Sequence, residues 1–378
     1  MKPEFNSRRL FGITRSKGKM YELGLPEALH IAVSANSEPQ ELFILTVGTL
    51  GDVAATLSHA ESVDVPLPPT TVEELGFSAS FFDAFPESRF SAEISRDTAL
   101  LAASAYYLAR RPESSLVLAR QLDVLAGGPP VDKLLHWTLL ARWAHYPADV
   151  HPFFGSALGN VARLLTSYFH DGSGLMELTS ELNALRGRAY EGASARDLLF
   201  IDIIAAIVRM RLAASAWTTL PGFTDITTER WATTIRRPEF PKELWPSQML
   251  LGRAGLFSGA SGIGQMPTSA GKTWSVEIVL RSGFLSGRTK LAVVVAPFRA
   301  LCHEIGTSLR HAFREDDVKV NELSDAMQLD FLQQGAELLG FEAPTSQYIL
   351  VLTPEKLLYV LRQTPTLTTP LCQTSCRL

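Results

Sequence analysis

Apolar residues recur at three- and four-residue intervals through most of the first 235 residues, and this spacing predicts amphipathic helices. The clearest run is 95–122, in which Ser95 suits the start of a helix and Pro112 predicts a break between two helices. Three further runs with the same spacing are 133–143, 153–168 and 175–185. We therefore expect an α-helical accessory domain over residues 1–235.

The pattern changes beyond about residue 236, where short continuous apolar runs alternate with helical ones. Lys290–Ala296 (KLAVVVA) and Tyr348–Leu352 (YILVL) have the unbroken apolar character of strands buried on both faces of a parallel sheet. A helical pattern follows each run directly, and this alternation predicts an α/β fold with a parallel sheet over residues 236–363. Residues 364–378 are rich in Thr, Pro and Cys, so we expect an irregular tail like that of an out-of-frame end.

The composition is that of a globular protein, with 46% hydrophobic and 20% charged residues. A net charge of -4 gives no basic bulk, so any nucleic-acid binding must come from a local arrangement of residues. The three cysteines favour a reducing compartment. The most apolar run, 198–217, contains Asp202 and two arginines, which indicates a buried helix rather than a membrane span. No signal-peptide pattern opens the chain, so we expect a cytoplasmic protein without membrane contact.

The strongest chemical signal is the run Gln265–Thr273 (QMPTSAGKT), which ends in Gly271, Lys272 and Thr273. Small residues let backbone N–H groups close around phosphate oxygens, and the start of the following helix favours an anion. In such a loop the lysine reaches the β- and γ-phosphates, and the threonine hydroxyl binds Mg²⁺. The sequence therefore predicts that residues 267–273 bind the phosphates of a nucleotide together with Mg²⁺. The residues expected to hold them are Pro267, Thr268, Ser269, Ala270, Gly271, Lys272 and Thr273.

The general phosphate-loop pattern requires glycine at position 266, where this chain has methionine. PTSAGKT nevertheless resembles the loop of one branch of the DEAD/DEAH-box superfamily 2 helicases, and three more segments resemble motifs of these proteins. They are Leu244–Gln248 (LWPSQ, similar to the Q motif), Ala296–Leu301 (APFRAL, motif Ia) and Thr353–Lys356 (TPEK, motif Ib). Each segment alone is also compatible with an ordinary turn or helix start. Four of them in the family's order and spacing favour the resemblance, which covers about residues 240–363.

The resemblance implies a RecA-like domain that binds ATP and Mg²⁺ and acts on a single strand of DNA or RNA independently of its sequence. Lys272 and Thr273 would serve catalysis, and the amide of Gln248 would pair with adenine. The backbone of the strand would lie against two helix starts, where N–H groups and a cation bind phosphate. The residues implied in that contact are Pro297, Arg299, Thr353 and Pro354.

The resemblance is incomplete after motif Ib, where neither a DExH box nor a second RecA-like domain follows in this sequence. We therefore expect the N-terminal part of an ATP-dependent helicase or translocase, inactive in hydrolysis when alone. The charged run 314–317 lies on the wrong side of motif Ib to replace that box, so it is expected to be a solvated surface.

Two other interpretations remain open. The chain is compatible with a nucleotide- or strand-binding protein that has no turnover, and with a helical scaffold in a phage-defence system. The sequence does not distinguish DNA from RNA, and it identifies no protein partner.

Overall fold

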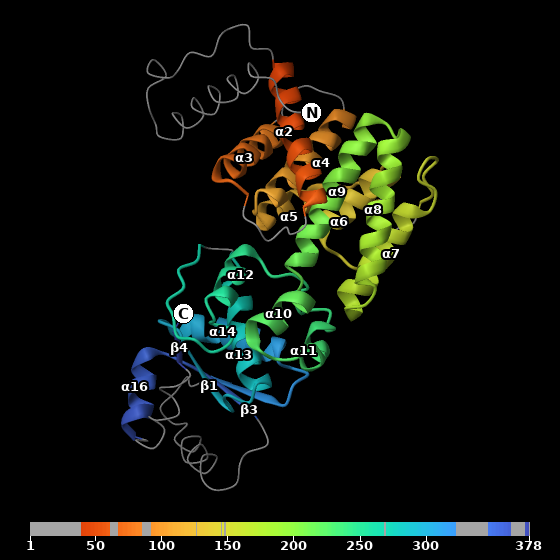
Figure 1. Ribbon diagram of the computed structural model, residues 1–378. Helices are drawn as coiled ribbons and strands as arrows, with labels where there is room; N and C mark the ends of the chain where they lie inside the picture. Colours follow the sequence, from red (N-terminus) through yellow and green to blue (C-terminus); the bar gives the residue numbers. More distant parts are fainter. Residues whose placement is uncertain are drawn as a thin grey trace, which may run out of the picture. The chain divides into compact units, whose positions relative to one another are not determined.

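The computed structural model describes residues 39–60, 67–84, 92–125, 127–144, 146, 149–267, 270–322, 347–363 and 375–377. The chain forms two compact units, Met1–Ser215 and Ala216–Leu378, and each is described by itself (Figure 1). The composition suggested a boundary near residue 235, whereas the structure groups residues 216–235 with the second unit. None of the described helices is long and apolar enough to cross a membrane.

The first unit is helical throughout its described part. Its helices are α2 (Pro39–His59), α3 (Pro69–Ala84), α4 (Ala92–Leu108), α5 (Pro112–Gln121), α6 (Pro130–Leu140), α7 (Ala157–Asp171), α8 (Leu175–Gly192) and α9 (Ala195–Ala213). The predicted break at Pro112 is confirmed, since this proline is the first residue of α5, where a missing N–H is tolerated. The predicted cap at Ser95 is wrong, because α4 already begins at Ala92.

Two helices of the first unit are buried along most of their length. In α6, every residue from Val131 to Leu140 is buried. The centre of α9 is also buried, as the apolar run predicted, and its acidic residue is neutralised there. Asp202 accepts hydrogen bonds from Arg186 Nε at 2.8 Å and from the Tyr190 hydroxyl at 2.7 Å. Because an unpaired buried charge is costly, this pairing allows α9 to pass through the core.

The second unit combines helices with a parallel sheet, as the strand–helix alternation predicted. Its elements are α10 (Ala216–Thr224), α11 (Thr228–Ile235), α12 (Pro246–Arg253), α13 (Lys272–Leu285), β1 (Leu291–Val295), α14 (Arg299–Ala312), β2 (Val318–Glu322), β3 (Gln347–Leu352), α16 (Pro354–Gln363) and β4 (Ser375–Arg377). The strands lie in the order β2-β3-β1-β4, and each neighbouring pair is parallel. The two apolar runs KLAVVVA and YILVL correspond to β1 and β3.

Helices cover both faces of this sheet (Figure 1). Val294 of β1 and Ile349 of β3 pack with residues of α13 and α14. Val293 and Leu350 pack with residues of α16 in a second core. Consecutive residues of β1 thus enter different cores, which explains why the strand has an unbroken apolar sequence. The strand ends at one edge of the sheet lead directly to the starts of α14 and α16.

The tail contributes a short strand that was not expected. Ser375–Arg377 pairs in parallel with Val293–Val295 of β1, so the prediction of irregular structure is wrong for these residues. The physical reason is that β1 would otherwise leave a row of backbone N–H and C=O groups unpaired at its free edge. Residues 364–374 lie outside the described part of the chain.

Candidate functional site

The start of α13 carries the groups that the sequence assigned to phosphate binding. Gly271 precedes the helix with a φ of 81°, a left-handed conformation that glycine adopts readily. The first helical hydrogen bond runs from Ser275 N–H to Gly271 O at 3.0 Å, so the N–H groups of residues 272–274 come before it. The side chains of Lys272 and Thr273 are exposed beside them. Such a helix start offers N–H donors, an ammonium and a hydroxyl to an anion.

Two side chains at the start of α12 hold the loop in place by donating hydrogen bonds to backbone carbonyls of the loop. Gln248 Nε2 donates a hydrogen bond to Gly271 O at 3.2 Å, and Ser247 Oγ donates one to Ala270 O at 2.7 Å. Gln248 Oε1 also accepts a hydrogen bond from the Trp245 N–H at 2.9 Å. The structure therefore brings the Q-motif-like segment into direct contact with the phosphate loop.

The position of Gln248 bears on its expected role in adenine recognition. Its side chain is only 2% exposed, and both its acceptor oxygen and its amide nitrogen already bond the protein. In this arrangement Gln248 positions the loop, and pairing with a base would require those hydrogen bonds to be exchanged.

The remaining predicted loop residues vary in environment. Pro267 is exposed and Ala270 is partly buried, while Thr268 and Ser269 lie outside the described residues. The preceding segment, 260–267, has no regular secondary structure and is largely exposed.

The hydrogen bonds of Gln248 predict the outcome of its removal. If the loop binds phosphate, Gln248→Ala should weaken ATP and GTP binding by a similar factor, because Gly271 loses the hydrogen bond that supports it. Loss of one buried hydrogen bond corresponds to about a fivefold effect. Titration calorimetry with each nucleotide measures it. A loss restricted to ATP would instead assign Gln248 to the recognition of adenine.

The two helix starts assigned to strand binding lie next to each other. Val295 and Leu352, the last residues of β1 and β3, are partners in the parallel register, and Ala296 N–H donates to Leu352 O at 3.0 Å. Pro297 and Arg299 are exposed after β1, and Arg299 is the first residue of α14.

After β3, Thr353 is buried and Pro354 is the exposed first residue of α16. All four residues therefore occupy one edge of the sheet, where a cation and two helix starts face solvent together.

An ion cluster beside α13, with Arg281 and Glu277 buried and Asp316 partly exposed, was not anticipated from the sequence. Asp316 accepts two hydrogen bonds from Arg237, at 2.6 and 2.7 Å, and one from Arg281 at 2.8 Å. Arg281 also donates to Glu277 at 2.7 Å and to Ala312 O at 2.6 Å. The cluster joins the segment after α11 to α13 and to the end of α14. Asp316 departs from the solvated surface expected at 314–317, because two arginines bind it and leave 22% of its side chain exposed.

The pKa values of the two acids in this cluster shift in opposite directions. Burial raises the pKa of Glu277, against the nearby charge of Arg281. Burial alone would raise the pKa of Asp316 as well, but the hydrogen bonds from Arg237 and the charge of Arg281 lower it. The two arginines therefore favour the ionised form of Asp316, whereas burial opposes ionisation of Glu277.

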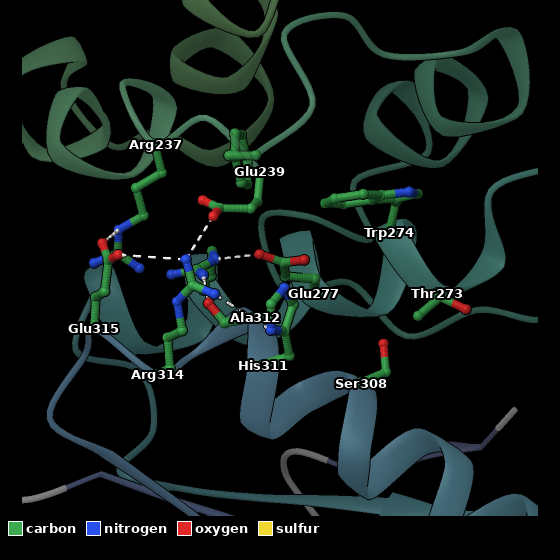
Figure 2. A pocket seen from close by; sticks show the side chains of 12 residues that line it. Arg237, Glu239, Thr273, Trp274, Glu277, Ser308, His311, Ala312, Arg314 and Glu315 are labelled. Carbon is green, nitrogen blue, oxygen red and sulfur yellow. Dashed lines mark hydrogen bonds and ion pairs between the residues drawn. The ribbon is translucent and has the colours of Figure 1, made fainter.

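A cavity of about 200 Å³ connects the ion cluster with the start of α13. Figure 2 shows Trp274 and Thr273 at one end and Arg237 with Glu315 at the other. Trp274, the residue after the loop, has 39% of its surface exposed. Trp274 was not predicted as a site residue, although a large aromatic residue directly after Gly-Lys-Thr is a visible signal in the sequence.

No cluster suited to a metal ion occurs among the described histidine, cysteine and acidic residues. The expected contribution to Mg²⁺ binding is a single hydroxyl, that of Thr273, which is exposed at the start of α13. That geometry fits a metal held mainly by phosphate oxygens and water.

Comparison with known proteins finds one family in the second unit. Residues 246–373 match the family model of the DEAD/DEAH box helicases. The matched region begins with α12 and includes the loop and the helix starts after β1 and β3. It extends beyond residue 363, into the segment that was expected to be an irregular tail. No curated protein matches the chain. The family match supports the helicase superfamily and, with it, an ATP-dependent action on nucleic acid.

Proposed function

We propose that this chain is part of an ATP-dependent nucleic-acid helicase or translocase whose second unit is a RecA-like ATP-binding domain. The observation that carries the proposal is the start of α13, where Gly271, Lys272 and Thr273 stand on a loop held by Gln248. This arrangement lies within the region that matches the helicase family. The backbone N–H groups, the Lys272 ammonium and the Thr273 hydroxyl therefore suit the phosphates and the metal ion of a bound nucleoside triphosphate.

In this proposal each residue of the loop makes a different contact with ATP. The N–H groups at the start of α13 donate to phosphate oxygens, and Lys272 contacts the β- and γ-phosphates. The Thr273 hydroxyl would hold Mg²⁺, and the ion would neutralise charge on the phosphates. The proposal also assigns the segment from Pro267 to Ala270 to the phosphate loop, because small residues let the backbone approach phosphate oxygens.

Replacement of Lys272 tests this function. Removing a charged hydrogen bond to phosphate costs roughly tenfold to a hundredfold in affinity, so Lys272→Ala should bind Mg²⁺-ATP at least about tenfold more weakly. Lys290→Ala is the matched control. Lys290 is an exposed lysine that lies beyond the C-terminal end of α13, whereas Lys272 lies at its start, so its loss should leave ATP binding unchanged. Titration calorimetry gives both values. Equal binding by wild type and Lys272→Ala would refute the assignment of the loop.

The edge of the sheet provides the strand-binding part of the proposal. A single strand of DNA or RNA would lie across the starts of α14 and α16, with its phosphates near Arg299 and the N–H groups of both helices. Pro297, Thr353 and Pro354 would shape that surface. Because only the backbone is contacted, binding should not depend on base sequence.

Salt dependence tests the contact with phosphate. Arg299→Ala should weaken binding of different sequences to a similar extent and lower the salt slope by about one. Arg310→Ala, at the other end of α14, is the control and should leave the slope unchanged. Fluorescence anisotropy with labelled oligonucleotides over a salt series measures the slope. A strong sequence preference that survives Arg299→Ala would contradict this contact.

A further inference from the structure

Trp274 is an exposed aromatic residue directly beside the proposed phosphate site at the start of α13. It belongs to the first turn of α13 and directly follows Thr273, and both residues line the cavity between α13 and α14. Figure 2 shows the indole ring and the side chain of Ser308 on opposite sides of the open space beside Thr273. A planar group that continues from phosphates on the loop can enter this space.

The three arginines that line the cavity are already paired with carboxylates. Arg281 and Arg237 bind Asp316, and Arg314 forms an ion pair with Glu239. A phosphate in the cavity would have to break one of these pairs. The indole face and the Ser308 hydroxyl take part in none of them, and they suit an uncharged, planar ligand better than an anion.

Gln248, the other candidate for contact with the base, already uses its side-chain amide in hydrogen bonds within the protein. The acceptor of its amide bonds Trp245 N–H, and its nitrogen bonds Gly271 O, in a side chain closed to solvent. Aromatic side chains bind nucleobases through stacking, which needs no hydrogen bond. Trp274 supplies such a face next to the phosphate site, and Gln248 does not.

We propose that Trp274 is a binding residue for the base of the nucleotide, whose phosphates lie on the loop at residues 270–273. This inference rests on the proposed ATP site and adds a second point of attachment to it. The indole stacks on the base within the cavity, while the N–H groups of α13 and Lys272 hold the triphosphate.

A ligand without a base distinguishes binding by the phosphate loop from binding by Trp274. Wild type, Trp274→Ala and Trp274→Phe are titrated with ATP and with tripolyphosphate in the presence of Mg²⁺. Stacking of one base contributes roughly fivefold to a hundredfold in affinity, so Trp274→Ala should lose about tenfold for ATP. Its affinity for tripolyphosphate should not change, and Trp274→Phe should retain most of the affinity for ATP.

Tyr359→Ala is the matched control, because Tyr359 is another partly exposed aromatic residue on a helix of the same unit, and its binding should equal wild type. Unchanged ATP affinity in Trp274→Ala would overturn the inference and leave the ATP site intact. An equal loss for ATP and tripolyphosphate would also overturn it, since Trp274 would then shape the loop. Failure of wild type to bind either ligand would refute the proposed function itself.

Discussion

Replacing Gly271 with alanine should weaken Mg²⁺-ATP binding by about a hundredfold. At a φ of 81° an added Cβ would lie 2.8 Å from Gln248 Nε2 and 3.7 Å from Trp245 Cε3. The strained backbone and the displaced amide together move the N–H groups and Lys272 away from the phosphates. Titration calorimetry with Mg²⁺-ATP measures the loss.

Gly287 provides the control for this prediction. It follows the other end of α13 with a φ of 75°, and nothing lies within 4 Å of an added Cβ. Gly287→Ala should therefore cost about 1–2 kcal/mol of stability from the backbone alone and leave nucleotide binding unchanged. If both variants bind ATP as wild type does, the conformation of Gly271 has no part in phosphate binding.

Removing Arg281 should destabilise the second unit by about 3–5 kcal/mol, because two carboxylates lose their buried cation. Arg281 is 4% exposed and binds Glu277, Asp316 and the carbonyl of Ala312. Its guanidinium also lies 4.2 Å from the centre of the Phe313 ring. Arg281→Met keeps much of the side-chain volume, so the measured loss reports the charge and the hydrogen bonds. Denaturant unfolding gives the free energy of unfolding.

Arg310→Met is the comparison for this loss. Arg310 is exposed on α14 and lies 3.9 Å from Glu322, a surface pair of a kind that contributes about 0–1 kcal/mol. If Arg281→Met destabilised the protein no more than Arg310→Met, the cluster would contribute as little as a surface pair.

The same cluster predicts how stability changes in acid. The pKa of Asp316 is lower in the folded protein than its usual value, so its stabilising effect is complete above that usual value. The effect is lost as pH falls below about 4 and through the folded pKa. Glu277 acts in the opposite sense, because its raised pKa favours protonation in the folded state.

The parts of the fold that depend on local sequence could be predicted. Unbroken apolar runs identified β1 and β3, and the proline-marked break between α4 and α5 followed from the lost N–H. The helix after Gly271 was expected because the loop pattern itself requires a helix start. In each case the deciding interactions lie within a few residues along the chain.

The contacts that join distant segments could not be predicted from these patterns. Gln248 meets Gly271 only after α12 has packed beside the loop, and Arg237 meets Asp316 only after α11 and α14 come together. An acidic run next to an exposed turn is usually solvated, and nothing local distinguishes Asp316 from its neighbours. Trp274 also required the structure, since its exposure depends on the cavity between α13 and α14.

Hydrogen–deuterium exchange tests the central claim most directly, because it locates bound nucleotide without any substitution. Mg²⁺-ATP should slow exchange in peptides that contain the N–H groups of residues 270–275, where the phosphates are held. Peptides from α6 and α9 in the first unit should exchange at unchanged rates. If ATP binds but residues 270–275 gain no protection, or if protection appears only in the first unit, the nucleotide does not bind at the start of α13.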